Sequence, residues 1–187
     1  RKESFSRIKP KHVSVLPGNS GGIEAILKTL PGVSSANELS SQYSVRGGNF
    51  DENLVYVNGI EVYRPFLVRS GQQEGLSFVN TNMVSNILFS AGGFGAKYGD
   101  KMSSVLDITY KQPRKNTGSL QLSLLGGSAH YEGVTKNKRL SYLIGSRYKT
   151  NQYLLSSLDT EAEYIPNFYD IQTFINYNIN TNWTISF

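Results

Sequence analysis

The sequence contains no cysteine and only two histidines. Without cysteine, neither a disulfide framework nor a thiolate metal site can form. His12 and His130 lie far apart in the sequence, with no histidine or carboxylate at ligand spacing, so no metal site is predicted. No serine or aspartate is combined with a base in a catalytic pattern. We therefore predict neither enzymatic activity nor a cofactor.

Long apolar runs are also missing. No stretch approaches the roughly 18 apolar residues of a transmembrane helix, so the chain could enter a membrane only as a β-barrel. Residues 1–5 lack the apolar centre of a signal peptide, and we expect that such a peptide was removed or never existed. The net charge is +5, but the basic residues are scattered, which argues against a nucleic-acid partner.

The composition favours β-structure, because 18 glycines and 12 tyrosines are present among 187 residues. Residues 1–10 are polar and basic and are interpreted as a linker. Residues 11–113 alternate short apolar runs with glycine-rich turns. From Gly118 onward a longer alternation of apolar and polar residues begins, and this change predicts a domain boundary.

An α+β fold is predicted for residues 11–113. Ile23, Ile26, Leu27 and Leu30 would form one face of a helix, which Asn19 or Ser20 caps and Pro31-Gly32 ends. Asn58-Gly59 predicts a tight hairpin, because both central residues of such a turn have positive φ. The other predicted strands are residues 12–16, 43–45, 54–57, 60–62, 87–89 and 105–110.

Residues 118–187 are predicted to form antiparallel strands with one apolar face. The strands are expected at 118–125, 128–134, 139–150, 168–179 and 183–187. This pattern is typical of a transmembrane barrel. The alternative is a soluble sheet that exposes one face to solvent. The short connections at 135–138 and 180–182 fall at one end and the long connection at 151–167 at the other, as in outer-membrane barrels.

Five sequence motifs follow one another along the chain. They are a helix and turn at 27–33, an Arg-Gly-Gly strand end at 43–48, a hairpin at 54–60, a closing helix and glycine turn at 84–87 and 94–99, and a last strand and exit at 105–109 and 111–113. In this order they resemble the plug domain of TonB-dependent receptors. The glycine turn at 92–99 has no phosphate-loop spacing, so a structural role is predicted.

The resemblance implies an α+β plug with a short mixed sheet and one or two short helices, followed by the first strands of an incomplete barrel. It also implies a nutrient importer in the outer membrane of a Gram-negative bacterium, most like those of the Bacteroidetes. The plug would lie in the lumen with a periplasmic N-terminus, and a periplasmic TonB-type protein would supply energy. Candidate ligands are an iron chelate (siderophore), a corrinoid, and an oligosaccharide or peptide. A TonB box is expected upstream of residues 1–10, and a plugged barrel has about 22 strands, so the chain is expected to be an N-terminal part.

The resemblance also indicates site residues. The plug's share of the substrate site would comprise Tyr63, Arg64, Phe66, Asn49 and Asp51, whose rings and charges suit stacking and bidentate hydrogen bonds. The alternative is that these loop residues only pack on the barrel wall.

Arg46 would contact a carboxylate of the barrel beyond Phe187, or would be an ordinary surface charge.

A β-rich surface-binding or adhesion protein without transport is the alternative function. In isolation, residues 118–187 are expected to aggregate, dimerise or need detergent, because their edges and apolar face lack partners.

Overall fold

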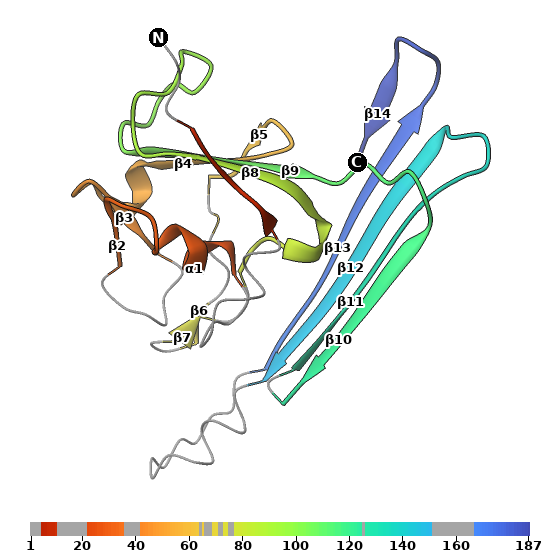
Figure 1. The fold of residues 1–187 in the computed structure, drawn as a ribbon, viewed down its shortest axis with the longest axis horizontal. Coiled ribbons are helices and arrows are strands. Elements are labelled where there is room, and N and C mark those ends of the chain that lie inside the picture. The colour runs from red at the N-terminus through yellow and green to blue at the C-terminus, as the bar shows by residue number, and fades with distance from the viewer. Residues whose placement is uncertain are drawn as a thin grey trace. The chain divides into compact units, whose positions relative to one another are not determined.

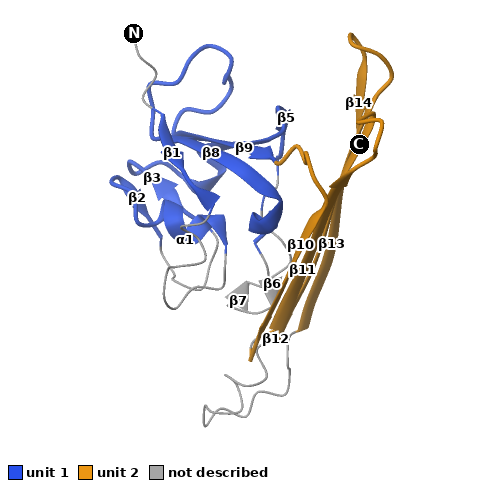
Figure 2. Ribbon diagram, turned by 45° about the vertical axis from the view of Figure 1, so that its right-hand side comes forward, with its two compact units in different colours: residues 1–110 blue, residues 111–187 orange. Residues whose placement is uncertain are grey.

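The computed structural model describes residues 5–10, 22–35, 42–63, 65, 69–70, 73–74, 77–124, 126–150 and 167–187 (Figure 1). The chain divides into two compact units, residues 1–110 and 111–187 (Figure 2). Each unit is described on its own. No helix in the described ranges has the length and apolar character needed to cross a membrane.

The first unit is built on a mixed five-stranded sheet. Its order is β1 (Ser6–Ile8), β8 (Val84–Ser90), β9 (Ser104–Tyr110), β4 (Asn53–Val57) and β5 (Ile60–Glu61). Strand β9 runs parallel to β4 and antiparallel to β8, so it is the central strand. The shorter elements are α1 (Ile23–Leu27), β2 (Val33–Ser34) with β3 (Ser44–Val45), β6 (Arg69–Ser70) with β7 (Gln73–Glu74), and the 3₁₀ turns η2 (Phe50–Glu52) and η3 (Thr81–Met83).

Both faces of this sheet are covered. Helix α1 buries Ile23 and Leu27 completely, and they pack in one core with Ile87 and Ile108. A smaller aromatic cluster covers the other face around Tyr98, whose ring centroid lies 5.6 Å from that of Phe5 and 5.6 Å from that of Tyr56. The Tyr98 hydroxyl donates a 2.6 Å hydrogen bond to Asp107.

The predicted helix is confirmed but is shorter than the apolar pattern suggested. It ends at Leu27, and the following turn is closed by the Thr29 hydroxyl, which donates to the carbonyl of Ile26 at 2.7 Å. Leu30 still packs on the core, although it lies outside the helix. Gly22 is the N-cap, and the predicted caps Asn19 and Ser20 lie outside the described residues. Gly32, at φ 79°, permits the turn after the helix.

The predicted Asn58-Gly59 hairpin is confirmed, because Asn58 has φ 52° and Gly59 has φ 81°. The turn joins β4 to β5, with Val57 opposite Ile60. The side-chain oxygen of Asn58 accepts a 2.8 Å hydrogen bond from the backbone N–H of Tyr110. The hairpin is therefore attached to the end of the central strand.

Two expectations for this unit are wrong. Residues 84–87 are not a closing helix, because they form the first half of β8, which buries Val84, Ile87 and Phe89. Residues 6–8 do not belong to a free linker, because they form β1, which pairs with β8 and buries Ile8. The predicted strand at 12–16 lies outside the described residues.

The second unit is an antiparallel meander in chain order. It contains β10 (Thr117–Ser123), β11 (Gly126–Val134), β12 (Leu140–Thr150), β13 (Asn167–Asn178) and β14 (Thr184–Ser186). All five predicted strands are confirmed within two residues at each end. The turns at 135–139 and 179–183 lie at the same end of the meander, two strands apart.

The two faces of the meander differ in polarity. The register places Tyr142, Ile144 and Tyr148 on one face, opposite Ile175, Thr173 and Tyr169 of β13. The large apolar side chains of this face are exposed: Leu120, Leu122, Tyr131, Ile144, Tyr148, Tyr169, Ile171, Ile175, Tyr177 and Ile185. The other face is mainly polar and includes His130, Arg147, Asp170 and Gln172.

Candidate functional site

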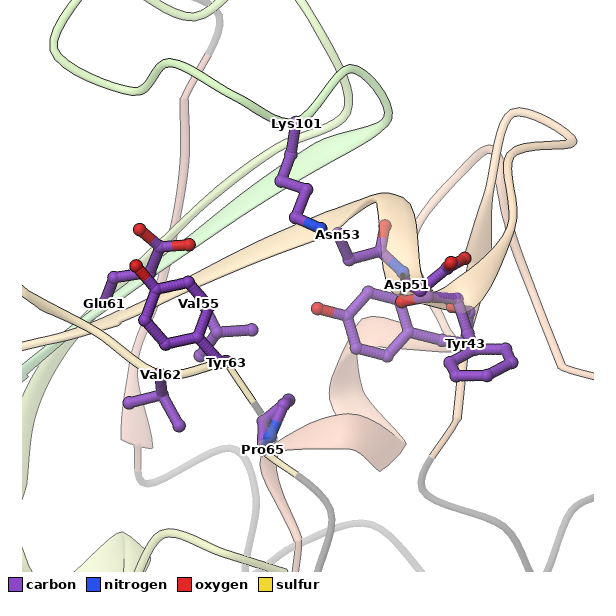
Figure 3. Close-up of a pocket in the computed structure, with 10 residues that line it drawn as sticks. Tyr43, Asp51, Asn53, Val55, Glu61, Val62, Tyr63, Pro65 and Lys101 are labelled. Carbon is purple, nitrogen blue, oxygen red and sulfur yellow. Dashed lines mark hydrogen bonds between the residues drawn. The ribbon is translucent and has the colours of Figure 1, made fainter.

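A hollow of about 300 Å³ opens on the first unit beside the β4–β5 hairpin (Figure 3). We call it the first-unit hollow. Tyr43 and Asp51 lie on one side of it and Glu61 and Tyr63 on the other, while Lys101 extends toward it from a separate loop (Figure 3). Its lining residues are Tyr43, Phe50, Asp51, Asn53, Val55, Glu61, Val62, Tyr63, Pro65 and Lys101.

The structure brings two of the five predicted substrate residues together. Asp51 and Tyr63 both line the hollow. Asn49 is exposed and directly precedes η2, where its carbonyl accepts a hydrogen bond from the N–H of Glu52 at 3.1 Å, but it is not among the lining residues. Arg64 and Phe66 lie outside the described residues.

Sequence reasoning missed several lining residues. Glu61 and Val62 belong to the predicted strand at 60–62, directly before Tyr63, so their position in the sequence could have indicated them. Tyr43 belongs to the recognised Arg-Gly-Gly motif. Lys101 comes from a loop distant in the sequence, and only the folded sheet brings it to the hollow.

One wall of the hollow is organised by Asn53. Its side-chain amide donates to the carbonyl of Tyr43 at 2.8 Å and to that of Phe50 at 3.1 Å. Its side-chain oxygen accepts from the hydroxyl of Ser104 at 2.7 Å. A single side chain therefore links β4 to three separate segments, so the wall is held in a defined geometry.

Tyr43 supplies a buried hydroxyl at this wall. The residue is 3% exposed. Burial raises the pKa of the Tyr43 phenol, the nearby charge of Glu24 raises it further, and the neighbouring side chain of Ser104 opposes this rise. The Glu24 carboxylate is itself buried and accepts a 2.9 Å hydrogen bond from Ser77. The phenol is therefore neutral near pH 7 and can donate a hydrogen bond.

The mouth of the hollow combines exposed rings with charges of both signs. Tyr63 is 80% exposed and Phe50 is 39% exposed. Asp51 and Glu61 supply carboxylates, and Lys101 supplies an ammonium group. Such a surface can stack on a planar or sugar ring and can bond to polar groups around the edge of that ring.

Arg46 lies in the turn that follows β3. Arg46 and Gly47 have positive φ values of 50° and 79°, and the N–H of Gly48 donates to the carbonyl of Val45 at 2.9 Å. Arg46 is exposed, and a Cβ added to Gly92 would lie 3.3 Å from its guanidinium. Its pairing with a carboxylate beyond Phe187 stays a prediction.

The polar face of the second unit carries two ionic groups. Arg147 pairs with Asp170, which also accepts a 2.8 Å hydrogen bond from Gln172. Glu132 lies 3.4 Å from the Lys111 ammonium and 3.1 Å from Nε2 of His130. Within the part of the chain that the structure describes, no group of three histidines or carboxylates could hold a metal ion.

The sequence from residue 5 to residue 105 matches the family model described as TonB-dependent Receptor Plug Domain. The chain belongs to this plug-domain family. The plug prediction is thus confirmed, and the match begins before the predicted domain start at residue 11. The Bacteroidetes-like character stays a prediction. No curated protein sequence matches the chain.

Solved receptor structures share the fold of this plug-family chain. The siderophore receptor PirA from Pseudomonas aeruginosa is 17% identical, with a TM-score of 0.65 over 100% of this chain and 34% of that one. The outer membrane transporter YddB from Escherichia coli is 13% identical, with a TM-score of 0.65 over 97% and 32%. The pyoverdine receptor FpvA from P. aeruginosa is 15% identical, with a TM-score of 0.66 over 100% and 27%. The chain thus spans about a third of these proteins or less. They are named as receptors and a transporter, not as enzymes.

Proposed function

We propose that this chain is the N-terminal part of a TonB-dependent receptor that imports a scarce solute across the outer membrane of a Gram-negative bacterium. Residues 11–113, together with β1, form the plug that closes the barrel lumen, and residues 118–187 form the first barrel strands. The proposal is supported by the plug-family match and by a strand meander that begins directly after residues 111–116.

The exposed apolar face of the meander is the main support for the proposal that residues 118–187 are barrel strands. Ile144 and Ile171, both exposed, lie in the middle of this face. Aromatic residues lie toward both ends: Tyr148 and Tyr169 at one, and Tyr142, Tyr177 and Trp183 at the other. A water-soluble sheet would bury such a face, whereas a lipid-facing barrel wall has an apolar band between two aromatic girdles. The polar face, with its ion pairs, then lines the lumen.

Connection lengths support an orientation. The turns at 135–139 and 179–183 would face the periplasm. The other end, which carries the long connection at 151–166 and the two-residue connection at 124–125, would face the outside. The plug's N-terminus would then be periplasmic, where a TonB-type protein could pull on it. In this arrangement Arg46 pairs with a carboxylate of a barrel strand beyond Phe187.

The first-unit hollow is proposed as the plug's share of the substrate site. Tyr63 and Asp51 line it, and Asn49, Arg64 and Phe66 lie close to these two in the sequence. The substrate would be an iron chelate, a corrinoid, or an oligosaccharide or peptide. Among the structural neighbours, PirA is named a siderophore receptor and FpvA is bound to pyoverdine.

The proposal is tested by uptake of labelled candidate solutes into cells that lack or carry the receptor. Uptake should require both the receptor and a TonB-type protein. If uptake persists without the TonB-type protein, the proposal of energised transport is wrong.

The site is tested by equilibrium binding to the purified receptor. Tyr63→Ala and Asp51→Ala should each weaken binding several-fold, because each removes a contact surface at the mouth of the hollow. Lys9→Ala, an exposed change away from the hollow, serves as the control. Unchanged affinity in both site variants would remove the hollow from the substrate site.

A further inference from the structure

Five exposed basic residues lie at the short-turn end of the strand meander. They are Arg114, Lys115, Lys136, Lys138 and Arg139, and we call them the basic turn patch. Three lie in the turn between β11 and β12, and two lie directly before β10. None of the five has an ion pair within the described ranges.

Hydrogen bonds bring the two parts of the patch together. The Asn116 side chain accepts from the N–H of Val134 at 3.0 Å, which fixes the start of β10 beside the end of β11. The N–H of Asn178 donates to the carbonyl of Arg139 at 2.8 Å, so β13 ends beside the same turn. The patch therefore extends across neighbouring strand ends.

The turn that carries three of these cations is closed by its own hydrogen bonds. The N–H of Thr135 donates to the carbonyl of Leu140 at 2.9 Å, and the N–H of Lys138 donates to the carbonyl of Thr135 at 2.8 Å. The Asn137 side chain accepts from the N–H of Arg139 at 3.2 Å. The charged groups of Lys136, Lys138 and Arg139 are not needed to hold the turn, so they are available to an external partner.

Negative charge is missing from this end of the meander. Residues 114–118, 134–141 and 175–187 contain no aspartate or glutamate. The nearest acid in the ladder is Glu132, and it already lies 3.4 Å from the Lys111 ammonium. The patch thus presents an uncompensated positive surface, which favours an anionic partner.

Exposed aromatic side chains adjoin the patch. Trp183, in the turn between β13 and β14, is 69% exposed. Tyr177 lies opposite Leu140, the residue after Arg139. The Tyr142 ring lies over Gly133 so closely that a Cβ there would be 2.4 Å from its hydroxyl. Aromatic rings beside lysines and arginines are the usual composition of a protein surface at the level of lipid headgroups.

We propose that the basic turn patch binds the phosphate groups of anionic phospholipids in the leaflet on the short-turn side of the membrane. The occupant is a phosphatidylglycerol headgroup, whose phosphate meets the cations while its acyl chains lie along the exposed apolar face. Membrane attraction of this kind grows with each lysine or arginine near the surface. This inference rests on the proposed barrel function.

The test uses the complete receptor in nanodiscs of equal parts phosphatidylglycerol and phosphatidylcholine, with native mass spectrometry to count the lipids that stay bound. The variant combines Arg114→Gln, Lys115→Gln, Lys136→Gln, Lys138→Asn and Arg139→Gln. Asparagine is used at 138 because Lys138 has φ 56°, a conformation that asparagine tolerates. The control, Arg7→Gln/Lys9→Gln/Lys97→Gln, removes three exposed positive charges from the first unit.

The wild type and the control should retain phosphatidylglycerol in preference to phosphatidylcholine, and the patch variant should lose this preference by roughly tenfold or more. Heat-modifiable electrophoretic mobility verifies that each barrel is folded. An unchanged preference in a folded patch variant, or an equal loss in the control, would overturn the inference alone. A receptor that stays in solution and does not enter nanodiscs would overturn both this inference and the proposed function.

Discussion

Arg147 and Asp170 face each other across β12 and β13 and form a two-point ion pair, with Nε 2.9 Å from Oδ1 and Nη2 2.5 Å from Oδ2. Gln172, two residues further along β13, donates to the same carboxylate at 2.8 Å. The pair is largely buried, with side-chain exposures of 10% and 18%. These contacts fix the register of two strands through side chains as well as through backbone bonds.

Arg147→Ala should destabilise the receptor by roughly 3 kcal/mol, because Asp170 would keep its buried charge without its cation. Arg147→Ala/Asp170→Ala should cost less than the sum of the two single changes. Denaturation of the detergent-solubilised receptor measures these free energies, with the exposed Arg139→Ala as the control. Additive single effects would show that the two residues do not stabilise each other.

Asn58→Ala should cost roughly 2 kcal/mol, because it removes the hydrogen bond to Tyr110 and places alanine at a positive φ. Asn58→Gly separates the two causes, since glycine accepts the backbone angle but cannot make the bond. It should therefore be intermediate in the free energy of unfolding. A glycine variant as stable as the wild type would mean that the side-chain bond contributes little.

Gly48→Ala should be more damaging than Gly47→Ala. A Cβ on Gly48 would lie 2.4 Å from the hydroxyl of Ser103 and 2.8 Å from the carboxylate of Glu52. A Cβ on Gly47 would meet no atom within 4 Å, so the only penalty there is the positive φ of 79°. We expect about 1 kcal/mol for Gly47→Ala and a larger loss, with weaker ligand binding, for Gly48→Ala.

The clash at Gly48 is tested by combining Gly48→Ala with Ser103→Gly. This second change removes the crowded side chain, although it also removes the 2.7 Å bond from Ser103 to the carbonyl of Val45. Partial recovery of thermal stability is expected relative to Gly48→Ala alone. No recovery would place the damage elsewhere.

Tyr43 should make stability fall at alkaline pH. Its folded pKa lies above the ordinary value of 10.0, so the folded and unfolded phenols are both neutral well below that pH. As the pH rises past the ordinary value, the unfolded phenol ionises first and the unfolded state gains stability. Tyr43→Phe should remove this part of the alkaline loss in denaturation experiments. An identical pH profile in the variant would contradict the assignment.

Local patterns were sufficient to predict much of this fold. The Asn58-Gly59 turn needs two positive φ angles, and few dipeptides favour them as strongly as Asn-Gly does. The strands of the second unit were predicted because each alternates between two different environments, and neighbours in the chain are also neighbours in the sheet. In both cases, the residues that carry the signal lie close together in the sequence.

The features that were missed depend on contacts distant in the sequence. Strand β9 pairs in parallel with β4, and no local motif indicates that Val105 lies beside Leu54. Strand β1 consists of three residues, and only its pairing with β8 makes it a strand. Lys101 reaches the hollow for the same reason, because the loop before β9 is carried there by the sheet.

The sheet order gives the two ends of the first unit unequal mechanical resistance. Strand β1, beside the N-terminal chain, is held at the edge by three residue pairs. Strand β9, which leads to residue 111, is held on both sides, by five pairs to β4 and six to β8. A tension applied at the N-terminal end therefore meets the weaker attachment, and the tether to the following strands is the last part to yield.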